Sequence, residues 1–155
     1  MARFSNSVVF SWAPEAIWDP SQKKYIVFWA SALYAANDAS HTGTTYDRIL
    51  RSTTTDFHTF TPAEVYIDYG RTVIDTTMVF DATSGIYYRF NKDVRTPTGN
   101  IPDSQFITQE KSKSVLGTWT EVATGIGKGS ITRGEGPTVF KSNTVASKVS
   151  KLKQA

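Results

Sequence analysis

Cysteine is absent from this chain of 155 residues, and methionine and histidine are rare, with two residues of each. Without cysteine the chain has no zinc site built on thiolates and no thiol nucleophile, and its core must form without disulfide bonds. This absence leaves the cellular compartment open. His41 and His58 lie in polar stretches with no matching serine or cysteine motif, which favours surface histidines over catalytic ones.

Long hydrophobic runs are also missing. No stretch is apolar enough to cross a bilayer, so we expect no membrane partner. The first six residues are too few and too polar, before the apolar run Ser7–Phe10, to act as a secretory signal. Helical periodicity is not found before residue 144. The sequence therefore predicts an all-β chain.

Acidic residues are lacking at the last fifteen positions, which carry Lys141, Lys148, Lys151 and Lys153. Taking these four from the 17 basic residues leaves 13 against 14 acidic residues, a net charge near −1 for the rest of the chain. The formal charge of +3 thus belongs to the C-terminal end and gives no case for a nucleic-acid partner. We expect residues 144–155 to form a basic tail that is frayed or weakly helical.

Strand-forming residues are abundant in the remaining sequence. The segments 24–30 and 85–90 are rich in aromatic and β-branched residues, and turn formers flank both. Asp19–Gln22 and Asp81–Gly85 are predicted to be tight hairpin connections. Two longer polar segments, 37–46 and 92–104, are predicted to be loops on the surface.

A repeat organises these strands. Asp75–Asp81 and Glu135–Lys141 are variants of one segment sixty residues apart, and each opens with a carboxylate. A further copy lies upstream at a spacing of sixty-two, where Ile17, Trp18, Asp19, Tyr25 and Phe28 match Val79, Phe80, Asp81, Tyr87 and Phe90. A repeat of this length that is rich in strand formers is typical of blades around an axis.

The predicted fold is a partial β-propeller with two four-stranded blades and part of a third. The blades would span about residues 12–70, 71–130 and 131–143, within one domain of residues 1–143. Asp75 and Glu135 would then begin neighbouring inner strands and point toward a common centre, which suits chemistry on sugars. The alternative is that both are turn or surface acids and that the repeat is a chance similarity between strands.

Three segments of the chain resemble signature segments of glycoside hydrolase family 43. They are Ser11–Asp19, Val73–Asp75 and Arg133–Pro137, and the run from Gly127 to Lys141 is similar to fungal members in particular. The resemblance covers about residues 12–143. It implies a five-bladed β-propeller that cleaves arabinose-, xylose- or galactose-containing plant polysaccharides with inversion.

The resemblance also implies roles for individual residues. Glu135 matches the general acid of the family, and Asp75 matches the aspartate that tunes the pKa of that acid. Inverting hydrolysis needs one carboxyl group that holds a proton and another that activates water. Trp12, Glu15 and Arg133 are the candidate substrate-binding residues. For two of them another role stays open, since Trp12 could pack between blades and Arg133 could pair with an acid on the rim.

No metal or cofactor is expected, and the resemblance implies a plant cell-wall polysaccharide or oligosaccharide as the partner. It also implies a secreted protein. One part of the family pattern is missing from the sequence. The general base would lie on a blade before Trp12, and residues 1–11 contain no aspartate or glutamate.

The sequence therefore indicates a truncated piece of the propeller, inactive by itself because the base is lacking. Open blade edges would favour self-association. The alternative is a non-catalytic carbohydrate-binding or assembly module that keeps the inner-strand carboxylates without the chemistry.

Overall fold

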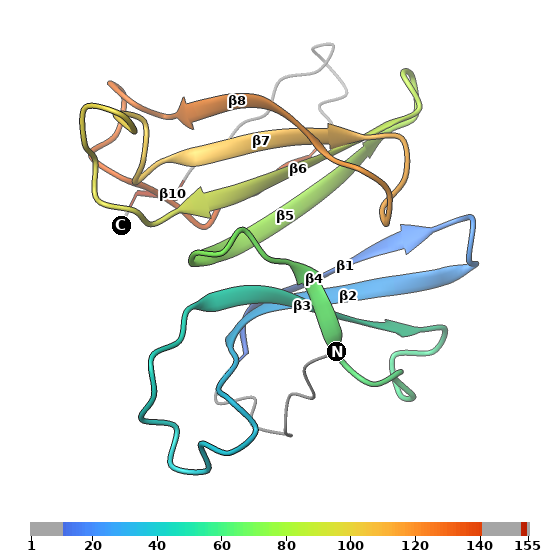
Figure 1. Cartoon of the computed structure of the whole chain (residues 1–155). Helices are drawn as coiled ribbons and strands as arrows, with labels where there is room; N and C mark the ends of the chain where they lie inside the picture. The colour runs from blue at the N-terminus through green and yellow to red at the C-terminus, as the bar shows by residue number, and fades with distance from the viewer. Residues whose placement is uncertain (1–10, 141–152, 155) are drawn as a thin grey trace. The chain divides into compact units, whose positions relative to one another are not determined.

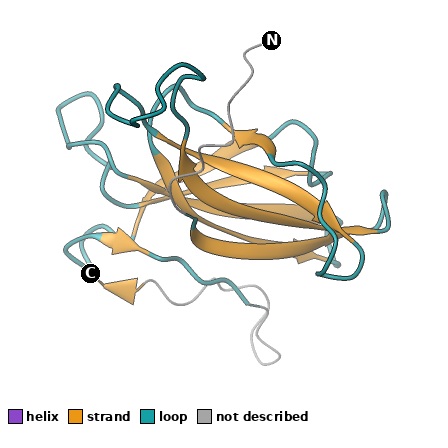
Figure 2. Cartoon of the chain, turned by 90° about the horizontal axis from the view of Figure 1, so that it is seen from below, coloured by secondary structure: helices purple, strands orange, loops and turns teal. Residues whose placement is uncertain are grey.

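The computed structural model of the chain describes residues 11–140 and 153–154. These residues form strands, turns and loops, with no helix among them (Figure 2). The chain divides between Ile74 and Asp75 into two compact units. Each unit contains one four-stranded antiparallel sheet, and the units are described one at a time below.

The first sheet is a meander in which each strand pairs with the next strand of the chain. Its strands are β1 (Trp12–Asp19), β2 (Lys24–Ala32), β3 (Asp47–Thr54) and β4 (Glu64–Ile67). The β1–β2 hairpin is held where the Asp19 Oδ1 accepts hydrogen bonds from the Ser21 N–H and hydroxyl, at 2.9 and 2.6 Å. Ile26, Phe28 and Ala30 are buried. Because side chains alternate along a strand, these three form one apolar face of β2.

The second sheet repeats this order with β5 (Val73–Asp81), β6 (Ile86–Asp93), β7 (Ile107–Ser112) and β8 (Thr120–Ile126) (Figure 1). The β5–β6 hairpin closes where the Gly85 N–H donates to the Asp81 carbonyl at 2.8 Å, with Gly85 at a φ of 70°. Phe90 and Ile107 are fully buried. The predicted strands and hairpin connections are thus confirmed, and the two sheets are consistent with blades of a partial β-propeller.

The last strands are short. Beyond β8, β9 (Gly134–Glu135) pairs antiparallel with β10 (Lys153–Gln154). The expectation of a frayed or weakly helical tail is therefore wrong for residues 153–154, whose backbone is a strand. The rest of the predicted tail, residues 144–152 and 155, lies outside the described residues.

One predicted loop begins later than expected. Lys92 and Asp93 belong to β6, and only 3% of each residue is exposed. Placing Lys92 at the start of a surface loop was therefore wrong. Lys92 lies two residues from Phe90 on the same strand, so the two side chains leave β6 on the same side.

The two units share a backbone feature near the start of the first strand. Ala13 in β1 and Asp75 in β5, sixty-two residues apart, both have a positive φ, of 47° and 53°. In β1 the pairing with β2 slips by one residue between Trp12 and Glu15, as it does at a β-bulge. Left-handed backbone is uncommon for residues other than glycine, asparagine and aspartate, so its recurrence at matched positions supports the repeat.

A buried polar network crosses the second sheet. Glu110 on β7 accepts hydrogen bonds from the Arg89 Nε at 2.5 Å and the Asn91 Nδ2 at 2.9 Å, both through Oε2. The Asn91 Oδ1 accepts a third bond, from the Thr76 hydroxyl of β5 at 2.7 Å. The Arg89 guanidinium also lies 4.3 Å from the ring centre of Trp119. The network thus ties β5, β6 and β7 together beside Asp75.

We expect Glu110→Gln to lower the free energy of unfolding by about 3–5 kcal/mol, because it leaves the Arg89 charge buried without its partner. The matched control is Glu64→Gln in the first sheet, where Glu64 pairs with Arg51 at 3.0 Å and its side chain is 58% exposed. That change should cost about 0–1 kcal/mol. Urea unfolding followed by circular dichroism measures the free energy of unfolding of both variants. If both lose the same amount, the buried ion pair stabilises the fold no more than the exposed one does.

Candidate functional site

Asp75 is held in an unusual backbone conformation near the start of β5. Its φ of 53° is sterically costly for a residue with a Cβ atom, and such residues tend to occur at functional sites. The residue is half-buried. Its Oδ2 accepts a hydrogen bond from the Gly136 N–H at 3.0 Å. The carboxylate therefore contacts the backbone of the residue that follows Glu135.

Glu135 is fixed by hydrogen bonds on either side of it. The preceding residue, Gly134, donates its N–H to the Gln105 carbonyl at 3.1 Å, and the following residue donates to Asp75. Glu135 itself is half-buried and lies in β9. The structure thus brings together Asp75 and the segment that carries Glu135, the two acids that the sequence singled out.

The glycine before Glu135 suits a close approach to the second sheet. A Cβ atom added to Gly134 would lie 3.3 Å from the Cγ1 of Ile107 and 3.4 Å from the Cα of Phe106. The first distance is tighter than ordinary van der Waals contact and the second is at its limit, so a larger residue would require a small shift of the Ile107 side chain or of β9. The glycine allows the segment with Glu135 to lie directly against the second sheet.

Lys92 is a member of this site that the sequence analysis missed. Its Nζ donates a hydrogen bond to the Gln105 carbonyl at 2.7 Å, the same oxygen that accepts the Gly134 N–H. Burial lowers the pKa of the Lys92 ammonium. The nearby carboxylate of Glu135 opposes this effect most strongly, followed by Asp75 and Asp93, whereas Arg133 adds to it. Both candidate acids therefore act on the charge of Lys92.

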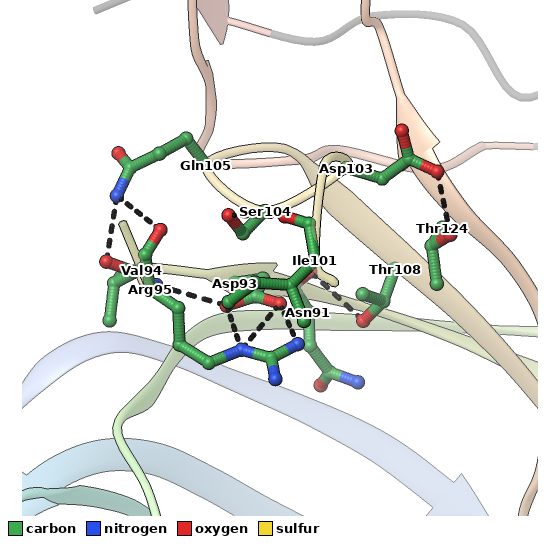
Figure 3. Close-up of polar contacts among 10 residues, drawn as sticks. All are labelled: Asn91, Asp93, Val94, Arg95, Ile101, Asp103, Ser104, Gln105, Thr108 and Thr124. Carbon is green, nitrogen blue, oxygen red and sulfur yellow. Dashed lines mark hydrogen bonds and ion pairs between the residues drawn. The ribbon is translucent and has the colours of Figure 1, made fainter. Parts of the chain in front are cut away.

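Gln105 holds the shared carbonyl in place. Its backbone has a φ of 68°, and its N–H donates to the Asp93 carbonyl at 3.0 Å. Its side-chain Nε2 donates to the carbonyls of Val94 and Arg95 at 2.7 and 2.8 Å, as Figure 3 shows. The Arg95 guanidinium in turn donates hydrogen bonds to both carboxylate oxygens of Asp93. Hydrogen bonds within the loop between β6 and β7 thus hold Gln105 in place.

The candidate substrate-binding residues fall in both units. Arg133 is exposed, immediately before β9, and its charge acts on Lys92 in the second unit. Trp12 and Glu15 belong to β1 of the first unit. Trp12 is 53% exposed and Glu15 is half-buried. Trp12 is thus accessible to solvent, which stacking on a sugar would require.

Two further observations concern other kinds of site. Within residues 11–140 and 153–154, no group of three or more His, Cys, Asp or Glu side chains is placed to hold a metal ion. The same residues contain no helix that is long and apolar enough to span a membrane. The charged cluster of the second unit contains the carboxylates of Asp75, Asp93 and Glu135 and the cationic side chains of Lys92 and Arg133, and carboxyl groups of this kind can hold and transfer a proton.

Similarity to known proteins agrees with this chemistry. The family model Glyco_hydro_43_rel, described as a probable glycosyl hydrolase domain, matches residues 2–150. An alpha-L-arabinofuranosidase of Bifidobacterium longum subsp. longum is 31% identical over an alignment 124 residues long that covers 74% of this chain. The chain spans only 12% of the length of that relative.

Proposed function

Because the chain belongs to the family of glycosyl hydrolase domains related to glycoside hydrolase family 43, we propose that it forms part of an inverting glycosidase. The substrates would be arabinose-, xylose- or galactose-containing plant polysaccharides. The name of the Bifidobacterium relative makes α-L-arabinofuranosides the first candidates. Asp75 and Glu135 carry the proposal, since glycoside hydrolysis depends on carboxyl groups and the Asp75 carboxylate contacts the backbone next to Glu135.

In this mechanism Glu135 donates a proton to the leaving oxygen of the glycosidic bond. Asp75 stays ionised and favours the protonated form of its neighbour until the reaction begins. What supports this pairing is the 3.0 Å hydrogen bond between the Asp75 carboxylate and the Gly136 N–H, one residue from Glu135. The base that activates water would come from a blade outside the two sheets. We use the term completed protein for this chain joined to segments that close the ring and carry that base.

The stereochemical outcome tests the inverting mechanism. We expect the completed protein to release sugar whose anomeric configuration is opposite to that of the substrate, because water attacks from the face opposite the leaving group. Proton NMR spectra recorded in the first minutes of hydrolysis, before mutarotation, distinguish the two anomers. Arabinan, xylan and galactan run in parallel identify the sugar. Retention of configuration, or release from none of these polymers, would overturn the proposal.

A further inference from the structure

Lys92 stands out because its burial is costly and its hydrogen bonding is sparse. The residue is 3% exposed, and the hydrogen bond from its Nζ goes to a neutral carbonyl, that of Gln105. Taking an ammonium group out of water costs several kcal/mol unless charges or hydrogen bonds replace the lost solvation. Within the described part of the chain, no ion pair is found for Lys92. A lysine that served packing alone would be better replaced by an apolar residue.

The position of the Lys92 ammonium group indicates a role for this buried charge. The Gln105 carbonyl accepts hydrogen bonds from both Lys92 and Gly134, so the ammonium is bonded to the same atom as the residue before Glu135. The charged groups around it are the carboxylates of Glu135, Asp75 and Asp93 and the guanidinium of Arg133. Among the charges that favour its protonated form, Glu135 has the largest effect.

We propose that Lys92 is a positioning residue for the acid pair. It ties the Gly134–Glu135 segment to the end of β6, and it supplies the positive charge that both Asp75 and Glu135 face. This inference rests on the proposed glycosidase function.

The two neighbours of Glu135 then have opposite electrostatic effects on it. The negative charge of Asp75 disfavours loss of the proton, whereas the positive charge of Lys92 stabilises the carboxylate that forms as the proton moves to the leaving oxygen. No bond to Lys92 is made or broken.

The electrostatic part is tested on the 155-residue chain by NMR titration of the Lys92 side chain. We expect Glu135→Gln to lower the pKa of Lys92 further, because the strongest charge that favours its protonated form is removed. The matched control is Glu121→Gln, an exposed acid on β8 of the same unit, which should leave the titration unchanged. Equal responses to the two changes would overturn the proposal. Lys92 is kept in both variants, so the test does not depend on replacing it.

The tethering part is tested with Lys92→Met, compared with Lys111→Met at an exposed site on β7. Loss of the ammonium should speed hydrogen exchange of the Gly134 amide by roughly three- to tenfold, the effect of losing one supporting hydrogen bond. Because the pKa of Lys92 is lowered by folding, its charge opposes folding at neutral pH, and this cost is relieved as pH rises toward 10.5. Lys92→Met should therefore not lower global stability. A global loss without faster local exchange would assign Lys92 a purely structural role.

Kinetics of the completed protein separate this proposal from the proposed function. Lys92→Met should lower kcat about tenfold or more with little change in KM, while Lys111→Met should change neither. If the completed protein hydrolyses no glycoside but the titration responds to Glu135→Gln, the function fails and the electrostatic assignment stands. If hydrolysis proceeds and kcat is unchanged by Lys92→Met, the positioning role is refuted.

Discussion

The isolated 155-residue chain is expected to release no sugar from arabinan, xylan or galactan, whereas the completed protein should hydrolyse at least one of them. An inverting glycosidase activates water with a base carboxylate while an acid protonates the leaving group. General acid–base catalysis contributes about 10²–10⁴-fold to the rate, so loss of the base alone would take hydrolysis below detection for a slow substrate. Reducing-sugar release over a day measures both proteins.

The control for this comparison is the folded state of the isolated chain. Circular dichroism and the dispersion of its NMR spectrum establish that both sheets are present before activity is assayed. Turnover by the folded chain at the rate of the completed protein would mean that the chain holds its own base. The assignment of the catalytic groups would then have to be rebuilt within residues 1–155.

In the completed protein, Glu135→Gln should reduce kcat on unactivated polysaccharide by about 10²–10⁴-fold. The amide keeps the size of the side chain but has no acidic proton to give to the leaving oxygen. The hydrogen bonds that hold β9, from Gly134 and Gly136, are made by backbone groups and should survive the change. The loss should therefore appear in the chemical step rather than in folding.

Glu121→Gln serves as the matched control because Glu121 is an exposed glutamate of the same unit on β8. It should retain full activity. If Glu135→Gln and Glu121→Gln have the same kcat, Glu135 is not the acid. If Glu135→Gln loses the dispersion of its spectrum, the residue would instead be needed for folding.

Most of the fold prediction depended on the repeat. Matching Tyr25 and Phe28 with Tyr87 and Phe90 predicted that the second strands are equivalent, and they are, as β2 and β6. This works because alternation of apolar residues and turn formers is a local property of the sequence. The pairing of residues 153–154 with β9 could not be predicted this way. It depends on contact with a separate segment, β9, which the local alternation of residues does not reveal.

Part of the candidate site was also predicted from the repeat. Asp75 and Glu135 occupy matched positions of two copies, and the contact of Asp75 with the Gly136 N–H brings their segments together. Gln105 was missed because its role depends on a left-handed backbone and on a loop that folds back on itself. Lys92 did leave a signal, since a lysine two residues from Phe90 must point to the same, buried side of a strand.

A series of aryl α-L-arabinofuranosides with increasingly acidic leaving groups tests most directly whether Glu135 is the proton donor. The quantity to measure is kcat/KM of the completed protein and of its Glu135→Gln variant across the series. A proton donor matters most for poor leaving groups, because a good one departs without protonation. The variant should therefore approach the unmodified protein for the most acidic phenols and fall steeply behind it for the least acidic. Parallel losses across the whole series, or no loss at all, would contradict the assignment of Glu135 as the acid.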